Sequence, residues 1–117
     1  MNCMHELALM QGILDVVTKN AHSYGLRRIT KIKLVIGKLR AVVPDSLEFC
    51  FTTLKEDIPL IAQGELEVEI KEIEGSCRRC SHQFLVEGYR FRCPQCQCTD
   101  IAVVSGSELY VDYIEGD

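Results

Sequence analysis

The first apolar pattern along the chain is that of an amphipathic helix near the amino terminus. Between Met4 and Tyr24, apolar residues recur at alternating steps of three and four, which places them on one helical face. Gly25 can end this helix. Glu6 in the first turn favours a start almost at the beginning of the chain, because a carboxylate stabilises the positive end of the helix dipole. The apolar face consists of Leu7, Met10, Leu14, Val17, Ala21 and Tyr24.

A strand, a second helix and a second strand are predicted next. Residues 29–36 are rich in β-branched types and alternate with lysines, and Gly37 closes this strand. Residues 65–70 alternate strictly between glutamate and aliphatic residues, so they form the clearest strand of the chain. Between them, Pro44 suits the first turn of a helix that ends before Pro59. Its apolar face contains Leu47, Cys50, Phe51, Leu54 and Ile58, so Cys50 is expected in the core.

The composition changes at Gly75 and Ser76. From there to about Ser105 the chain carries cysteines, arginines and short β-prone pieces, which indicates a second unit. Residues 109–114 alternate again but are too few to bury a face alone, so we expect them to join the sheet of the first unit.

Length and cysteine usage narrow the class of protein. A chain of 117 residues, 47% of them hydrophobic, is one ordinary globular domain, so a small second unit needs a metal or a disulfide for stability. Neither a membrane-spanning run nor a secretory signal is found, which predicts a cytoplasmic protein. Seven cysteines in a reducing compartment stay thiols, and metal ligation explains most of them better than disulfides.

Four of these cysteines form two C-x2-C pairs, Cys77 with Cys80 and Cys93 with Cys96. A two-residue spacing lets both sulfurs of a pair reach one tetrahedral Zn²⁺ ion from a tight turn. The twelve residues between the pairs are expected to form a hairpin with Gly88 near its turn. Four thiolates leave no open coordination position, so the predicted zinc is structural and not hydrolytic.

Other interpretations of these cysteines remain open. A redox dithiol would sit in a βαβ setting and would not occur as a matched pair. Cys98 could compete with Cys96 as fourth ligand, although a C-x-C spacing suits the turn less well. His82 is more readily a solvated histidine than a ligand, since it lies inside the expected hairpin.

Charge separates the remaining function classes. The formal charge of −4 becomes about −6 once four thiolates hold Zn²⁺, and such a surface repels phosphate backbones. The alternative of a zinc-ribbon nucleic-acid-binding or protein-interaction module rests on Arg78, Arg79 and the segment Tyr89–Arg92. No catalytic constellation is found, so no enzyme is predicted. Glutamates 65, 67 and 69 are expected on an exposed strand face that serves solubility or docking.

Several motifs, taken in order, resemble the HypA/HybF family of hydrogenase-maturation nickel metallochaperones. The resemblance covers the chain from Met4 onward. It is carried by Met4-His5-Glu6-Leu7, by Val35-Ile-Gly37-Lys38-Leu39, by Pro44-Asp-Ser-Leu47, by the two cysteine pairs and by Ser105-Gly-Ser-Glu-Leu109.

This resemblance implies an α+β fold and a function. The fold is a nickel-binding domain of two helices and a three-stranded mixed sheet, residues 4–75 and 106–117, with a zinc-ribbon-like four-cysteine module, residues 76–105, inserted before the last strand. The function is delivery of Ni²⁺ to the large subunit of [NiFe]-hydrogenase, together with a GTPase of the same pathway. Cys77, Cys80, Cys93 and Cys96 match the family's zinc ligands. A homodimer and a supply of nickel to urease are further possibilities, and no nucleic acid or membrane partner is implied.

The implied nickel site is the backbone of Met4, His5 and Glu6 with the His5 imidazole. Imidazole and deprotonated amide nitrogens offer the square-planar field that Ni²⁺ accepts. Without the resemblance, His5 is a lone histidine and Glu6 a helix-dipole carboxylate at a frayed terminus.

Three positions depart from the family pattern. Residues 1–3 precede the usual start, so Cys3 could replace the family's terminal amine as a ligand, or the site could be weakened. Gln97 follows Cys96 where such turns carry glycine, which predicts a small strain. Ser107 replaces a usual arginine, and a partner contact can be lost there.

Overall fold

The computed structural model describes the backbone of residues 3–117 and the side chains of residues 5–117. Contacts divide the chain into two compact units. The helical unit contains the described residues up to 35, with 42–69 and 110–117, and the cysteine unit contains 36–41 and 70–109. The domain limits expected from the sequence stay a prediction. No helix of the described chain is long and apolar enough to cross a bilayer.

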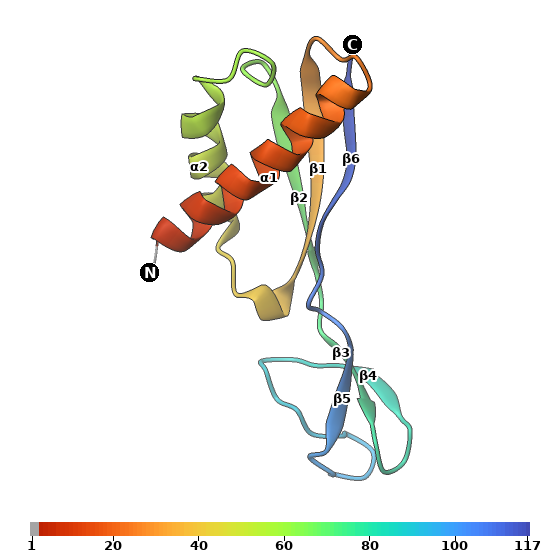
Figure 1. Ribbon diagram of the computed structural model, residues 1–117. Helices are drawn as coiled ribbons and strands as arrows, with labels where there is room; N and C mark the ends of the chain where they lie inside the picture. Colours follow the sequence, from red (N-terminus) through yellow and green to blue (C-terminus); the bar gives the residue numbers. More distant parts are fainter. Residues whose placement is uncertain (1–2) are drawn as a thin grey trace. The chain divides into compact units, whose positions relative to one another are not determined.

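The helical unit is built on a three-stranded sheet with the strand order β2-β1-β6 (Figure 1). Strands β1 and β2 run parallel and are joined through α2, whereas β6 runs antiparallel to β1, with residue 117 paired to Arg28 and Glu108 to Gly37. The expected mixed sheet, including the return of the last strand, is confirmed. The elements are α1 Cys3–Ser23, β1 Ile29–Gly37, α2 Pro44–Lys55, β2 Glu65–Lys71 and β6 Leu109–Gly116.

The apolar face of α1 packs into the core with one exception. Met10, Leu14, Val17 and Ala21 are buried as predicted. Tyr24 is 80% exposed, so the prediction that it lies on the buried face is wrong. The reason is the helix end: Gly25 adopts a left-handed φ of 71°, and the N–H of Leu26 donates to the carbonyl of Ala21. Tyr24 therefore lies in the terminating turn and not on the helix.

The second helix starts where the sequence predicts and ends earlier. Pro44 occupies its first turn, and Cys50 is buried in the core as expected. The helix ends at Lys55, three residues before the expected limit, because single turns follow and the Lys55 ammonium donates to the carbonyl of Gly64 at 3.0 Å.

The glutamates of β2 are not an isolated acidic surface. Glu67 forms ion pairs with Lys31 and Lys33 of β1, both at 2.8 Å, and Glu69 pairs with Lys33 at 3.3 Å. Hydrogen bonds from Lys31 and Lys33 lower the pKa of Glu67 to about 2. Alternation alone does not reveal this cross-strand charge pairing, and the predicted role of the glutamate face in solubility or docking stays a prediction.

The cysteine unit has its own three-stranded antiparallel sheet with the order β4-β3-β5. The hairpin expected between the cysteine pairs is wrong, because Tyr89–Arg92 forms no strand and β4 pairs instead with the segment before Cys77. The first cysteine turn reverses the chain, so its two flanks become neighbours. The elements are β3 Glu74–Cys77, β4 Gln83–Leu85, β5 Ile101–Ser105 and the short 3-10 helix η1 Lys38–Arg40.

Two glycines let the ends of this unit pass closely. A Cβ on Gly37 would lie 2.1 Å from the backbone of Gly106, and Gly106 itself has a φ of 121°. The N–H of Gly37 donates to the carbonyl of Glu108, and the Glu108 carboxylate accepts from the N–H of Gly106 at 2.9 Å. Arg40 donates to the carbonyl of Ser107 at 2.8 Å, a contact that does not depend on the Ser107 side chain.

Candidate metal centres

The four cysteines of the two pairs converge in one cluster of the cysteine unit. All four Sγ atoms lie within 4.8 Å of one another, with 3.5 Å between Cys77 and Cys96 and 3.6 Å between Cys80 and Cys93. In a tetrahedral site with Zn–S bonds of about 2.3 Å, sulfurs stand about 3.8 Å apart. The cluster therefore has the size and the donor set that fit Zn²⁺.

Each cysteine pair is held in a tight turn by backbone hydrogen bonds. In the first turn, the N–H groups of Arg79 and Cys80 donate to the Cys77 sulfur, each at 3.4 Å. The N–H of Ser81 donates to the carbonyl of Cys77, whose own N–H donates to the carbonyl of His82. These bonds point N–H dipoles at the sulfur, which favours the thiolate that a metal needs.

The second cysteine turn, from Cys93 to Cys96, has the same backbone-to-backbone hydrogen bonds as the first. The N–H of Gln97 donates to the carbonyl of Cys93 at 2.9 Å, and the N–H of Cys93 donates to the carbonyl of Cys98 at 2.8 Å. Ser81 and Gln97, which follow the second cysteine of each turn, both adopt left-handed φ values, 67° and 65°. The conformation that favours glycine is thus present at both positions, as the sequence predicts for Gln97.

Cys98 and His82, the two alternative ligands, occupy equivalent positions after the two cysteine turns. The Cys98 sulfur lies outside the four-sulfur group and accepts instead from the N–H of Asp100 at 3.4 Å. The His82 ring stacks on Phe84 with 5.9 Å between ring centroids. Both residues close their turns through the backbone, and Cys96 keeps the fourth place in the cluster.

The shifted pKa values of the cysteine thiols indicate that the cluster needs a bound cation to ionise fully. Hydrogen bonds from the backbone of Cys80 and Arg79 lower the pKa of Cys77 to about 6. The pKa of Cys96 is raised to about 12: the N–H of Cys98 lowers it, but burial and the neighbouring sulfurs outweigh that bond. Some of these thiols ionise readily, but they cannot all do so without a positive charge between them.

The cluster is a closed site. Cys77 and Cys93 are buried, Cys96 is half-buried and Cys80 is exposed, but the four protein sulfurs together complete a tetrahedral coordination sphere. A metal held there has no open position for a substrate or for an activated water, so the site can stabilise the unit but cannot perform hydrolysis.

The amino-terminal candidate residues lie at the start of α1, in the helical unit. His5 is exposed, whereas the Glu6 side chain is only 3% exposed, and its Oε1 has no hydrogen-bond partner among the residues that the structure describes. The side chains of Cys3 and Met4 lie outside the described ones. The sequence assigned only the backbone of Glu6; its buried carboxylate appears only in three dimensions, because polar residues are not counted in an apolar face.

Comparison with known proteins places these features in a family. The family model described as hydrogenase/urease nickel incorporation metallochaperone HypA matches residues 4–116. A hydrogenase maturation factor HypA of Moorella thermoacetica is 40% identical over 97% of this chain and its own full length. The HypA of Chlorobium luteolum is 37% identical over 95% of this chain and 94% of its own.

Solved structures agree at the level of the fold. A solution structure of the nickel metallochaperone HypA from Helicobacter pylori has a TM-score of 0.68 at 19% identity and covers 95% of this chain and 96% of its own. A second solution structure of a HypA protein has a TM-score of 0.72 at 20% identity, with 97% and 96% covered. The α+β fold predicted from the sequence is confirmed.

Proposed function

Because the chain belongs to the HypA family of hydrogenase/urease nickel-incorporation metallochaperones, we propose that it binds Ni²⁺ around His5 and delivers it to the large subunit of [NiFe]-hydrogenase. A second metal, Zn²⁺, is held by the four cysteines and stays with the protein. The chain acts as a carrier and a maturation factor and catalyses no reaction of its own.

The start of α1 supports the nickel site. Because the helix begins at Cys3, the N–H groups of Met4 and His5 belong to a first turn whose amides have no intrahelical acceptor. Their deprotonation by a bound metal would therefore break no helix hydrogen bond. The exposed His5 imidazole supplies a nitrogen ligand beside them, and such nitrogens suit square-planar Ni²⁺.

Two further groups can complete this site. With residues 1–3 retained, the Cys3 thiolate takes the place of the terminal amine of the family pattern. The Glu6 carboxylate, buried with one oxygen unsatisfied among the described residues, is suited to meet the positive charge that a metal brings. Because its imidazole ligand, His5, is exposed, a site of this kind can release its metal, as a carrier must.

The four-cysteine cluster supports zinc as the resident metal. Soft thiolates in a tetrahedral arrangement match Zn²⁺, whereas square-planar Ni²⁺ prefers nitrogen ligands and another geometry. A unit of this size buries too little apolar surface to fold alone, so the free energy of metal binding stabilises its fold.

The partners are those that nickel delivery requires. They are the hydrogenase large subunit as acceptor and a maturation GTPase, with self-association to a homodimer as a further feature and urease as a second destination. The described cysteines form no disulfide, which suits the reducing cytoplasm in which these partners would meet the chain.

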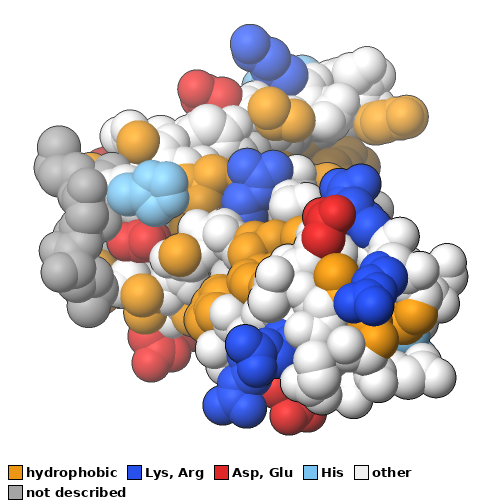
Figure 2. Space-filling model, turned by 90° about the horizontal axis from the view of Figure 1, so that it is seen from below, with side chains coloured by type: hydrophobic (Ala, Val, Ile, Leu, Met, Phe, Trp, Pro, Cys, Tyr) orange, Lys and Arg blue, Asp and Glu red, His pale blue; other side chains and the backbone are white. Residues whose placement is uncertain are grey.

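A nucleic-acid-binding role has less support. Arg78 is already paired with Asp100 at 3.2 Å. On the face drawn in Figure 2, Lys and Arg side chains stand in separate groups with acidic and uncharged side chains between them. Phosphate backbones are usually held by several neighbouring unpaired cations, and the chain carries a formal charge of −4.

The nickel proposal is tested by metal binding to His5→Ala, with His22→Ala as matched control. His22 is also exposed on α1 but lies in its last turn. We expect the unchanged chain and His22→Ala to bind one Ni²⁺ per chain in equilibrium dialysis, and His5→Ala to bind none tightly. Zinc content should stay at one per chain in all three proteins. Unchanged nickel binding by His5→Ala would overturn the amino-terminal site.

A further inference from the structure

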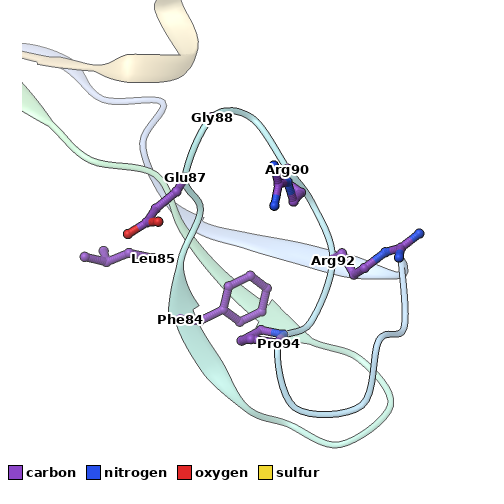
Figure 3. A pocket seen from close by; sticks show the side chains of 7 residues that line it. All are labelled: Phe84, Leu85, Glu87, Gly88, Arg90, Arg92 and Pro94. Carbon is purple, nitrogen blue, oxygen red and sulfur yellow. The ribbon is translucent and has the colours of Figure 1, made fainter.

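The cysteine unit contains a hollow that the metal sites do not use. It has a volume of about 330 Å³ and lies between β4 and the segment 88–94 (Figure 3). In Figure 3 the Phe84 ring and Pro94 lie together at its base, while Arg90 and Arg92 extend from the segment that arches over it. Leu85, Glu87 and Gly88 complete the lining.

The two arginines of this hollow differ from Lys38 and Arg78 of the same unit, which are paired, whereas Arg79, also without a side-chain partner among the described residues, lies outside the hollow. Lys38 is paired with Glu72 at 3.0 Å, and Arg78 with Asp100. Within the part of the chain that the structure describes, the side chains of Arg90 and Arg92 have no hydrogen-bond or ion-pair partner, and both are exposed. The carboxylate of Glu87 extends away from both guanidinium groups (Figure 3). Two guanidinium groups are therefore free to take an anionic ligand.

The backbone holds both arginines in fixed places. Gly88 and Tyr89 have left-handed φ values of 58° and 57°, and the N–H of Arg90 donates to the carbonyl of Glu87 at 3.0 Å, which closes a tight turn. The other end of the segment is Cys93, a member of the four-sulfur cluster. The backbone of Arg90 and Arg92 thus lies between a closed turn and a cysteine of the cluster, so on binding order has to be gained by the two side chains and little by the backbone.

A second hollow, of about 620 Å³, borders the same arginines on the side of the second cysteine turn. It is lined by Arg90, Arg92, Cys93, Pro94 and Gln97. The two arginines therefore line both hollows, one over Phe84 and Pro94 and the other beside the second cysteine turn.

We propose that this hollow docks an acidic peptide segment of a protein partner, in which a carboxylate side chain stands beside an apolar one. The planar guanidinium groups of Arg90 and Arg92 would donate paired hydrogen bonds to the carboxylates, a geometry for which arginine is suited. The Phe84 ring and Pro94 would contact the apolar neighbour. Since Cys93 anchors one end, the metal in the cluster would hold the docking surface in shape.

Nucleic acid fits this surface less well than a peptide. A phosphodiester chain spans many contacts and needs several neighbouring cations, but here only two arginines line the hollow, in a chain of formal charge −4. A short acidic segment needs only those two.

The test uses the zinc-loaded full chain without nickel, so it does not depend on the nickel proposal. Random dodecapeptides displayed on phage are selected on the protein, and an enriched peptide is labelled with fluorescein and titrated by anisotropy. We expect enrichment of Asp or Glu beside apolar residues, and affinity that falls with salt. Arg90→Glu and Arg92→Glu should weaken binding roughly tenfold or more, and the glutamine variants less.

Arg27→Glu is the matched control, because it makes the same charge reversal at an exposed position of the helical unit, outside both hollows and outside the cysteine turns. It should bind the peptide as the unchanged chain does, and all variants should retain one zinc. The proposal is overturned if no acidic peptides are enriched or if the charge reversals leave binding unchanged. It is also overturned if those reversals release zinc, which would make the arginines counter-charges of the cluster, or if a twenty-residue oligothymidylate binds there in place of peptides.

Discussion

The two units of the chain reach stability by different means. The helical unit buries a continuous apolar core in which Met10, Ile32, Leu34, Leu47 and Ile61 are each 0% exposed. In the cysteine unit the most deeply buried side chains include two cysteines of the cluster, and exposed apolar residues such as Leu85 and Val104 stand on its strands. One unit relies on apolar burial and the other on sulfur ligands, so a change that disables one should leave the other folded.

The two candidate metal sites differ in how they are built. The cluster is built from hydrogen-bonded turns that place four sulfurs together, whereas His5 stands exposed in the first turn of a helix. A closed site retains its metal and an open one can pass it on.

The largest effect is expected for Cys93→Ser. Removal of one of four thiolates should abolish tight zinc binding and unfold the cysteine unit, because structural zinc contributes about 10 kcal/mol or more to such units. Zinc content, measured by atomic absorption, should fall close to zero. Cys98→Ser is the control and should retain one zinc, since the Cys98 sulfur lies outside the cluster. Loss of zinc in both variants would contradict the assignment of ligands.

Acid should empty the two sites in a defined order. Metal binding requires deprotonated ligands, so falling pH weakens both sites. The cluster keeps a partly ionised ligand down to the pKa of Cys77 of about 6, whereas a site made of amide nitrogens must displace protons that are held far more strongly. Nickel should therefore leave at a higher pH than zinc, in a titration followed with a chromophoric chelator. The reverse order would mean that nickel is not bound by backbone nitrogens.

Leu34→Ala tests the stability of the helical unit. Leu34 lies in β1 and is fully buried, so the truncation should lower the free energy of unfolding of the helical unit by about 2–5 kcal/mol. Zinc content should not change. Val16→Ala, at a 53% exposed position of α1, should change stability by less than about 0.5 kcal/mol. Zinc loss in Leu34→Ala would show that the two units do not fold independently.

Gly75→Ala should have a smaller effect, confined to the cysteine unit. A Cβ at Gly75 would lie 2.7 Å from Ile101 Cγ2 and 3.3 Å from Val86 Cγ2, so the small apolar cluster over β3 must shift, at a cost of about 1–3 kcal/mol. Gly12→Ala is the control, because nothing lies within 4 Å of a Cβ there and alanine favours the helix. Chemical denaturation of the zinc-loaded proteins should show opposite shifts for the two variants. If Gly75→Ala is as stable as the unchanged chain, packing over Gly75 contributes nothing.

Much of the fold follows from the sequence because each element repeats a simple pattern. The steps of three and four in α1, the alternation in β1, β2 and β6, and the paired cysteines are local signals, and the structure has all of them. The prediction of Tyr24 on the buried face was wrong because a periodic pattern does not include the turn that ends a helix. The pairing of β4 with β3 was not predicted, because it depends on how a cysteine turn reverses the chain.

The candidate sites also differ in whether the sequence alone could predict them. Cys77, Cys80, Cys93 and Cys96 could be grouped from spacing alone, since ligand spacing is a local property. The buried carboxylate of Glu6 and the hollow beside Arg90 and Arg92 could not, because burial and a missing partner are properties of the folded chain. Glu67 and Lys31 likewise pair across strands that lie far apart in sequence.

X-ray absorption at the zinc and nickel edges of one sample, loaded with both metals, tests the division between the sites most directly. The account predicts four sulfur neighbours at about 2.3 Å around zinc. Around nickel it predicts nitrogen ligands including imidazole, with at most one sulfur, from Cys3. Nickel surrounded by four sulfurs, or zinc displaced as nickel is added, would contradict the account.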